Sequence, residues 1–300
     1  MVEWSDGYWG SSDGLKLHYR DYAGEASRPP IICIPGLTRN ARDFEGVAAR
    51  LAGQWRVLCV ELRGRGKSEP AKDPMTYMPV TYLRDMEALI AELKLERFIL
   101  FGTSLGGLIT MLLAASGKDR IAGALLNDIG PEIETRGLDR IRSYVGRSQN
   151  WPTWLHAARA IAEAQGDRYP DWDLDEWLAY AKRLCRLTSG GRIVFDYDMR
   201  IAEPFKAPQG EAGFDLWPAF RALDGIPSLI VHGELSDVLS AASVAKMTGA
   251  IPSMESATVP RVGHAPTLDE AEAQKAIDKL LKRVGPQESS RRKPGPKNTE

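Results

Sequence analysis

The sequence predicts an α/β fold in which a mostly parallel central sheet is covered by helices on both faces. Short, near-continuous apolar runs of the kind that form buried parallel strands occur at 31–34, 57–60, 98–101, 122–126 and 228–231. Helix-like segments lie between them, such as Thr81 to Leu93 with its apolar residues on one face. Residues 15–20 instead alternate apolar and polar side chains, which is typical of a half-exposed antiparallel edge strand.

The size and charge of the chain favour a small-molecule partner. Its 300 residues, 43% of them hydrophobic, are enough to bury a sizeable core. The 39 basic and 40 acidic residues give a formal net charge of -1. Such a balance gives no reason to expect electrostatic binding to nucleic acid or to an anionic membrane.

The beginning of the chain lacks the basic and then apolar order of a secretory signal, and no apolar run has the length of a membrane span. We therefore expect a soluble, cytoplasmic protein with no membrane partner. The three cysteines are odd in number and match neither a zinc site nor a disulfide framework. Cys33 and Cys59 lie in apolar runs, so we expect them in the core.

The alternation of strands and helices stops after Pro131. The next convincing strand starts at Ser228, and five of the eight tryptophans fall between these two points. Helical periodicity in this stretch predicts an inserted helical cap over 131–217, with the α/β core formed by 1–130 and 218–284. Residues 285–300 are polar, basic and rich in glycine and proline, which predicts a disordered tail.

Ser104 is the candidate nucleophile. It lies in Gly102-Thr103-Ser104-Leu105-Gly106, directly after an apolar strand and before a helix-like run. A sharp turn between strand and helix forces the serine into a strained conformation and brings the two elements together, so it favours glycine two residues before and two residues after.

This strand, turn and helix resemble the nucleophile elbow of the α/β-hydrolase superfamily, whose pattern the chain matches from about Gly7 to Val284. The resemblance implies an α/β-hydrolase fold and a nucleophile, acid and histidine that follow one another in that order. The members that it resembles include esterases, enol-lactonases and carbon–carbon bond hydrolases with a helical cap. It also implies that no metal or organic cofactor is needed.

Asp237 and His264 occupy the positions at which the family usually carries its acid and its base. Asp128, which follows the preceding core strand, is an alternative acid at a site that a minority of the superfamily uses, and Glu234 is a weaker one. An imidazole suits the base because its pKa lies near working pH. The acid would hold that imidazole in one tautomer and stabilise its charged form.

The resemblance places the oxyanion hole at the backbone amides of Leu37 and Leu105. Such donors stabilise the charge that develops on the carbonyl oxygen and need no particular side chain. Many relatives have His-Gly where this chain has Pro35-Gly36, which leaves the donor intact but weakens assignment to a subfamily. The run from Leu62 to Ser68 ends like a phosphate-binding loop, but it lacks the first glycine, so we expect it to be structural.

Three residues are candidates for substrate binding. Arg39 either binds a substrate carboxylate or faces solvent. Trp151 and Trp154 either wall an apolar acyl pocket or pack the cap against the core.

The leading functional hypothesis is hydrolysis of a small or medium carboxylic ester or lactone through an acyl-enzyme on Ser104. A carbon–carbon bond hydrolase of ring-cleavage diketone acids is the main alternative, since that family pairs the same catalytic groups with a cap. A cofactor-free perhydrolase or acyltransferase would also use these groups, and a ligand receptor without enzymatic activity belongs to another class. Oligomeric state and physiological substrate do not follow from the motifs.

Overall fold

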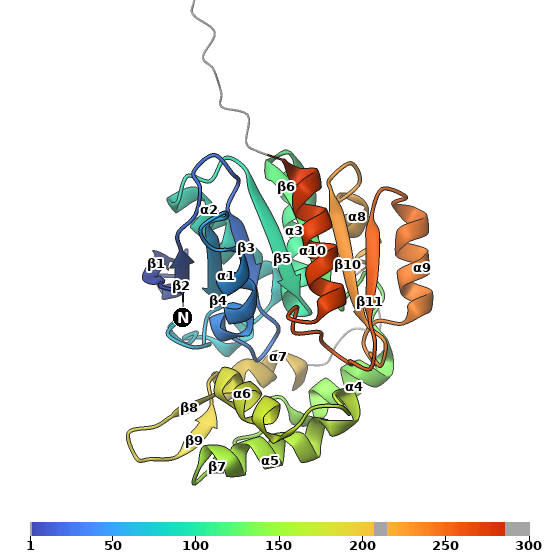
Figure 1. Ribbon diagram of the computed structural model, residues 1–300. Coiled ribbons are helices and arrows are strands. Elements are labelled where there is room, and N and C mark those ends of the chain that lie inside the picture. Colours follow the sequence, from blue (N-terminus) through green and yellow to red (C-terminus); the bar gives the residue numbers. More distant parts are fainter. Residues whose placement is uncertain (1, 207–214, 286–300) are drawn as a thin grey trace, which may run out of the picture.

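The computed structural model describes residues 2–206 and 215–285, and an eight-stranded sheet runs through its centre (Figure 1). The first two strand pairs in the sheet are antiparallel and the other five are parallel, which confirms the predicted mostly parallel sheet with its antiparallel edge. In spatial order the strands are β1 (Ser5–Gly10), β2 (Lys16–Tyr22), β4 (Val57–Glu61), β3 (Ile31–Ile34), β5 (Phe98–Thr103), β6 (Ile121–Asn127), β10 (Ser228–Gly233) and β11 (Glu255–Val259). The edge strand β1 was not predicted.

Alternate residues of the central strands pack on opposite faces of the sheet. In β3, Ile32 and Ile34 belong to one buried cluster, and Ile31 and Cys33 belong to the other. Both faces are therefore apolar, which explains the near-continuous apolar runs. Cys33 is buried and free, as is Cys59 opposite it on β4, so their expected place in the core is confirmed.

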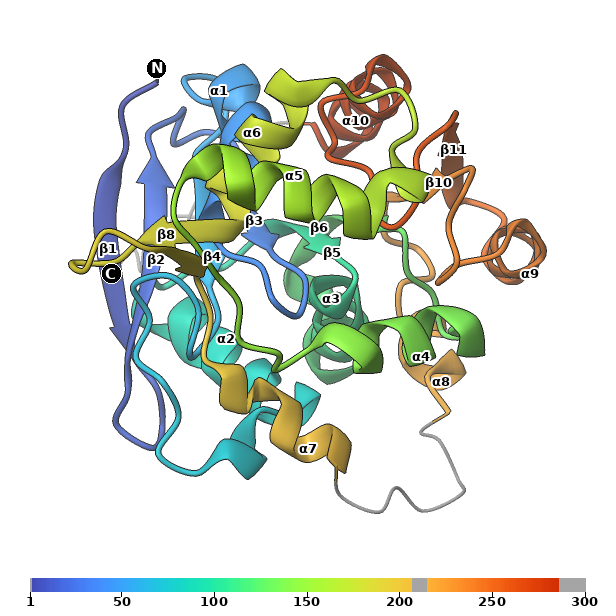
Figure 2. The ribbon, with the colours of Figure 1, turned by 90° about the horizontal axis from the view of Figure 1, so that it is seen from below.

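Helices cover both faces of the sheet, and Figure 2 shows them on its two sides. One face carries α1 (Glu45–Leu51) and α10 (Ala271–Val284), and the other carries α2 (Pro79–Glu92), α3 (Leu105–Gly117) and α8 (Trp217–Arg221). Helix α9 (Ala241–Ala250) lies beside the edge strand β11. The strand before Ser104 and the helix after it are thus part of one packed α/β core.

Residues 131–206, which we call the cap segment, lie across the ends of the sheet strands (Figures 1 and 2). Its helices and strands are α4 (Thr135–Tyr144), β7 (Asn150–Trp151), α5 (Trp154–Gln165), α6 (Leu174–Leu184), β8 (Cys185–Leu187), β9 (Ile193–Phe195) and α7 (Glu203–Lys206). Three of these are strands that form a small antiparallel sheet in the order β7-β9-β8, which the sequence analysis did not predict within the helical cap. The turn Ser189-Gly190-Gly191, which joins β8 to β9, is the sequence signal for this hairpin.

Two parts of the predicted organisation lie wholly or partly outside the described residues. The predicted tail, 285–300, lies outside the described residues except for Gly285, and so does part of the predicted cap, 207–214. Within the described ranges no helix combines the length and the apolar character that a membrane span requires.

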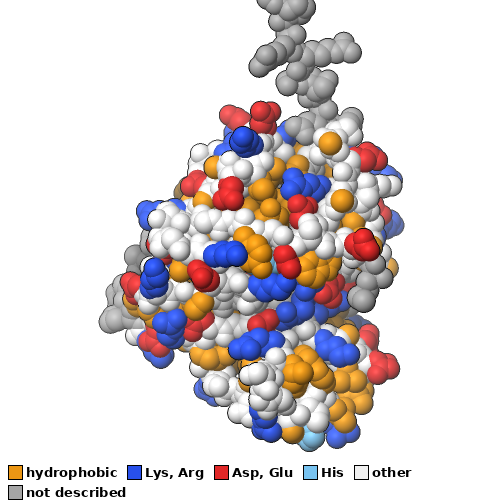
Figure 3. All heavy atoms as spheres, turned by 90° about the vertical axis from the view of Figure 1, so that its left-hand side faces the viewer, with side chains coloured by type: hydrophobic (Ala, Val, Ile, Leu, Met, Phe, Trp, Pro, Cys, Tyr) orange, Lys and Arg blue, Asp and Glu red, His pale blue; other side chains and the backbone are white. Residues whose placement is uncertain are grey.

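On the face shown in Figure 3, side chains of both charge signs are interspersed, with Lys and Arg frequent where the core meets the cap segment.

A buried ion pair ties α2 to the loop after β4. Arg63 donates through Nε and Nη2 to both carboxylate oxygens of Asp85, at 2.7 and 2.6 Å, and both side chains are almost fully buried. Removal of one partner leaves a charge that water cannot solvate.

We expect Asp85→Asn to lower the free energy of unfolding by about 3 kcal/mol, because Arg63 would lose its buried carboxylate and keep only the half-exposed Asp13 as an ionised partner, beside the hydroxyl of Thr76. Urea denaturation measures the effect. Asp139→Asn is the matched control, since Asp139 pairs with Arg142 on the exposed surface and such pairs contribute about 0–1 kcal/mol. Equal stability of the two variants would contradict a stabilising role of the buried pair.

Candidate active site

The turn between β5 and α3 places the hydroxyl of Ser104 at the end of the sheet. Ser104 has φ 52° and ψ -115°, and its amide donates to the carbonyl of Asn127 at 3.0 Å. A Cβ on Gly102 would lie 2.4 Å from the Gly106 carbonyl oxygen, and a Cβ on Gly106 would lie 2.0 Å from that of Ile34. Both glycines are therefore required for the close approach of strand and helix, as expected for such an elbow.

A continuous line of hydrogen bonds joins Ser104 to a buried carboxylate. Ser104 Oγ lies 3.0 Å from His264 Nε2, and His264 Nδ1 lies 2.8 Å from Asp128 Oδ2. An ionised carboxylate only accepts, so Nδ1 carries the proton of the neutral ring and Nε2 is left to accept from the serine hydroxyl. The geometry is that of a nucleophile, its base and an orienting acid.

Asp128 follows β6 and is fully buried. Its Oδ1 accepts from the Gly233 amide at 2.8 Å, and its Oδ2 also accepts from Ser236 Oγ at 2.5 Å. Its own amide donates to the Val231 carbonyl at 2.7 Å. The last residue of β10 and the loop after it, where the sequence predicted the acid, therefore supply the donors that hold Asp128 in place.

Asp237 forms its hydrogen bonds with Arg140, and His264 forms its own with Asp128, which corrects the predicted acid–base pair. The carboxylate of Asp237 is bound by Arg140 of α4 through Nη2 at 2.6 Å and Nε at 2.5 Å. Burial raises the pKa of Asp237, but the hydrogen bonds and charge of Arg140 outweigh it and hold that pKa below its usual value. Gly137 allows this approach, since a Cβ there would lie 2.4 Å from the Asp237 carbonyl oxygen. The carboxylate that binds His264 belongs to Asp128, the alternative acid of the sequence analysis. The weaker alternative, Glu234, accepts from the Arg261 amide.

The segment after β3 carries the first predicted oxyanion donor. Gly36 and Leu37 line the same cavity as Ser104, and a Cβ on Gly36 would lie 3.6 Å from Ser104 Cβ. Arg65 holds the backbone of Leu37 in place, because its Nε and Nη2 donate to the Leu37 carbonyl at 2.9 and 2.7 Å. The second predicted donor, the amide of Leu105, lies in the first turn of α3, where helix amides lack helical acceptors.

Arg65 comes from the glycine-rich run that resembled a phosphate-binding loop. Its side chain is fully buried and lies over the ring of Tyr82, whose hydroxyl accepts from Nη1 at 3.0 Å. Gly66 has φ 54°, and a Cβ there would lie 2.2 Å from the carboxylate of Glu61. These contacts give the run a structural role.

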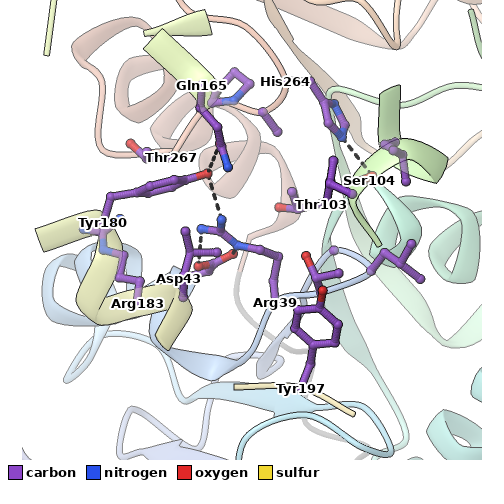
Figure 4. Close-up of a pocket in the computed structure, with 18 of the residues that line it drawn as sticks. Arg39, Asp43, Thr103, Ser104, Gln165, Tyr180, Arg183, Tyr197, His264 and Thr267 are labelled. Carbon is purple, nitrogen blue, oxygen red and sulfur yellow. Dashed lines mark hydrogen bonds and ion pairs between the residues drawn. The ribbon is translucent and has the colours of Figure 1, made fainter. Parts of the chain in front are cut away.

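The cavity beside Ser104 is bounded by both the core and the cap segment (Figure 4). Its polar and aromatic lining from the cap segment was not predicted: Arg140, Tyr144, Gln165, Tyr169, Tyr180, Arg183, Phe195 and Tyr197. Burial raises the pKa of Tyr197 to about 12 and also raises that of Tyr169, so these hydroxyls stay neutral. Arg140 with Tyr144 and Tyr180 with Arg183 share helix faces at spacings of four and three residues, a pattern visible in the sequence.

Arg39 lines the cavity but fits neither of its two predicted roles fully. It is mostly buried rather than exposed to solvent, and its Nε and Nη2 bind both carboxylate oxygens of Asp43 at 2.6 Å. Its Nη1 donates to the hydroxyl of Tyr180 at 2.8 Å, so it links the core to α6. Binding of a substrate carboxylate by Arg39 stays a prediction.

Trp151 and Trp154 are absent from the lining of the cavity within the described part of the chain. Both are partly buried against the apolar cluster between α1, α10 and the cap segment, and Trp151 meets Phe195 edge to face at 5.2 Å between ring centroids. The alternative prediction, packing, describes their contacts. Residues 2–206 and 215–285 also contain no group of three or more His, Cys, Asp or Glu side chains that could hold a metal ion.

Comparison with known proteins decides the family. The model of the alpha/beta hydrolase family matches residues 31–276. The chain belongs to this family. The predicted family and fold are thereby confirmed, and this alpha/beta hydrolase is an enzyme that hydrolyses its substrate.

Individual relatives of this alpha/beta hydrolase cover most of its length. A 3-hydroxybutyrate-oligomer hydrolase from Cupriavidus necator is 37% identical over 84% of this chain and 88% of that protein. A 2-(acetamidomethylene)succinate hydrolase from Mesorhizobium japonicum is 28% identical over 80% of this chain and 83% of that protein. A crystal structure of an alpha/beta hydrolase from Novosphingobium aromaticivorans is 61% identical, with a TM-score of 0.91 over 94% of this chain and 99% of that one.

Asp128 binds His264 and Asp237 binds Arg140, so substitution of each shows which carboxylate is the functional acid. We expect Asp128→Asn to lower kcat/KM for a chromogenic ester by about 10⁴-fold, because an amide no longer favours the Nδ1–H tautomer or stabilises the imidazolium. Asp237→Asn leaves the contact between His264 and Asp128 intact, so its kcat/KM should stay within about tenfold of wild type. The reverse order of the two losses would show that Asp237 is the functional acid.

Proposed function

We propose that this enzyme is a serine hydrolase that cleaves a small or medium carboxylic ester or lactone through an acyl-enzyme on Ser104. One observation carries the proposal: Ser104, His264 and Asp128 form a continuous hydrogen-bonded line at a cavity. Serine hydroxyls are weak nucleophiles unless a base accepts their proton, and His264 Nε2 lies within hydrogen-bond distance to do so.

The first half of the proposed reaction acylates the enzyme. Ser104 Oγ attacks the ester carbonyl while its proton moves to His264 Nε2, and Asp128 stabilises the imidazolium that forms. The amides of Leu37 and Leu105 bind the oxyanion, and such donors are typically worth about 100- to 1,000-fold in rate each. The tetrahedral intermediate then collapses, the bond to the alcohol oxygen breaks, and His264 returns the proton to that oxygen.

The second half releases the acid. Water enters beside His264, which removes its proton as the water oxygen attacks the acyl carbonyl. Collapse of the second tetrahedral intermediate breaks the bond to Ser104 Oγ, which regains the proton from His264. The product acid and the free enzyme result, with no metal or cofactor involved.

We further propose that the ester joins short hydroxy acids. The relative from Cupriavidus necator, which is 37% identical over most of both chains, is a 3-hydroxybutyrate-oligomer hydrolase. The polar cavity, with Arg and Tyr side chains instead of tryptophans, is suited to such oxygen-rich substrates better than to long apolar acyl chains.

A substrate panel separates this proposal from its alternatives. Rapid turnover of short hydroxy-acid esters and chromogenic esters supports it, and selective cleavage of a vinylogous diketone acid would favour a carbon–carbon bond hydrolase. Peracid formation from acid and hydrogen peroxide would favour a perhydrolase. Tight binding without turnover would favour a receptor.

The role of Ser104 has a direct test. We expect Ser104→Ala to lower kcat on the order of 10⁶-fold, as removal of the nucleophile does in serine hydrolases, while its thermal unfolding stays like that of wild type. Mass spectrometry of the quenched wild-type reaction should find the acyl group on the peptide that contains Ser104. Retention of most activity by Ser104→Ala would eliminate the acyl-enzyme mechanism.

The contact between Arg65 and the Leu37 carbonyl yields another prediction. Arg65→Lys keeps the charge but loses the double hydrogen bond, so we expect kcat to fall by up to about 100-fold with little change in KM, since a shift near 1 Å can cost that much. Tyr82→Phe is the control, because it removes another Arg65 contact and leaves Leu37 alone. If Arg65→Lys loses thermal stability while kcat is unchanged, Arg65 does not position the oxyanion hole.

A further inference from the structure

The cavity has two chemically different ends. Figure 4 shows Ser104 and His264 on one side of it, with Arg39, Tyr180 and Arg183 grouped on the other. The first end holds the reacting groups. The second end therefore faces the part of the substrate that does not react.

The charges that line the cavity are unbalanced. Three lining residues are arginines, Arg39, Arg140 and Arg183, and Asp43 is the one lining carboxylate among the described residues. A partly enclosed, low-dielectric cavity with a positive lining attracts and orients an anion.

The carboxylates that pair with the other two arginines lie outside the lining. Asp237 binds Arg140, and Asp269 accepts from Arg183 Nη2 at 3.0 Å. Arg140 and Arg183 therefore line the cavity, while the carboxylates that pair with them do not.

Arg183 has the greatest capacity to bind an anion. Arg39 and Arg140 each bind their carboxylate through both Nε and Nη2, whereas Arg183 uses Nη2 alone among the contacts of the described residues. A guanidinium has five N–H donors, so Arg183 retains a pair for a bidentate contact. Its side chain is 22% exposed, which leaves it accessible to a ligand.

The core holds Arg183 in place. Its carbonyl oxygen accepts from Asn40 Nδ2 at 3.0 Å and from Arg42 Nε at 3.1 Å. Asn40 is completely buried, in the segment that follows the predicted oxyanion donor Leu37. The position of Arg183 at the end of α6 is therefore fixed relative to the backbone on which the reaction depends.

We propose that the enzyme acts on esters that carry a free carboxylate, and that Arg183 binds this carboxylate across the cavity from Ser104. The inference rests on the function proposed above and narrows its substrate class to anionic esters. The carboxylate belongs to the acyl part or to the alcohol part of the ester, and the two arms of the experiment distinguish these sources.

The first experiment compares charged and neutral esters that are otherwise alike. The acyl arm uses mono-4-nitrophenyl glutarate against its methyl ester, and the alcohol arm uses the linear dimer of 3-hydroxybutyrate against its methyl ester. In at least one arm wild type should prefer the anion by about 10- to 100-fold in kcat/KM, the range that one charge-assisted contact supports. Equal rates for the charged and neutral members of both pairs would overturn the proposal.

Variants then assign the preference to Arg183. Arg183→Gln should raise KM for the anion much more than KM for its neutral methyl ester, so that most of the preference is lost, and Arg183→Lys should retain part of it. Arg186→Gln is the control, since Arg186 is 56% exposed on β8 and does not line the cavity. An equal loss on charged and neutral esters in Arg183→Gln would show that Arg183 only supports the fold.

A binding measurement separates failure of this inference from failure of the proposed function. Glutarate should protect Ser104 of wild type from a fluorophosphonate and should not protect Ser104 of Arg183→Gln. If no ester in the panel is turned over but this difference holds, the carboxylate site stands and the proposed reaction is wrong. If neutral esters are hydrolysed and glutarate protects neither protein, the reaction stands and the carboxylate site is wrong.

Discussion

The orientation of His264 depends on its hydrogen bond to the buried carboxylate of Asp128. This carboxylate accepts hydrogen bonds from the Gly233 amide, the Ser236 hydroxyl and the His264 ring, and so connects the ends of β6 and β10 to the loop of the histidine. A fully buried charge is costly unless its oxygens are hydrogen-bonded, and here both oxygens have partners. Because these partners come from packed strands and short loops, the imidazole is oriented before a substrate arrives.

The cap segment is held against the same groups. Tyr169 donates to the Ala265 carbonyl at 2.9 Å, the Gly263 amide donates to the Arg168 carbonyl at 2.7 Å, and Arg140 binds Asp237. The first two contacts flank His264 in the sequence. The cap segment therefore both encloses the cavity and restrains the loop that carries His264.

Local signals were sufficient for the core and the elbow. Apolar runs in the sequence predicted five central strands. Gly102 and Gly106 predicted a tight turn, and the structure leaves no room for a Cβ at either position. The acid could not be chosen in this way, since Asp128 and Asp237 both follow strands and only long-range packing decides which one meets His264. The ion pair between Arg140 and Asp237 depends on how α4 lies over the core. No sequence pattern within a single segment predicts this arrangement. The lining of the cavity escaped prediction for the same reason.

Proton magnetic resonance of His264 tests the central claim, that Asp128 orients the catalytic imidazole, most directly. A ring Nδ1–H that donates to a buried carboxylate is strongly deshielded and protected from exchange with water, so its resonance should lie far downfield of the backbone amides. The structure predicts this resonance in wild type and in Asp237→Asn, and its loss in Asp128→Asn. Its persistence in Asp128→Asn together with its loss in Asp237→Asn would contradict the account.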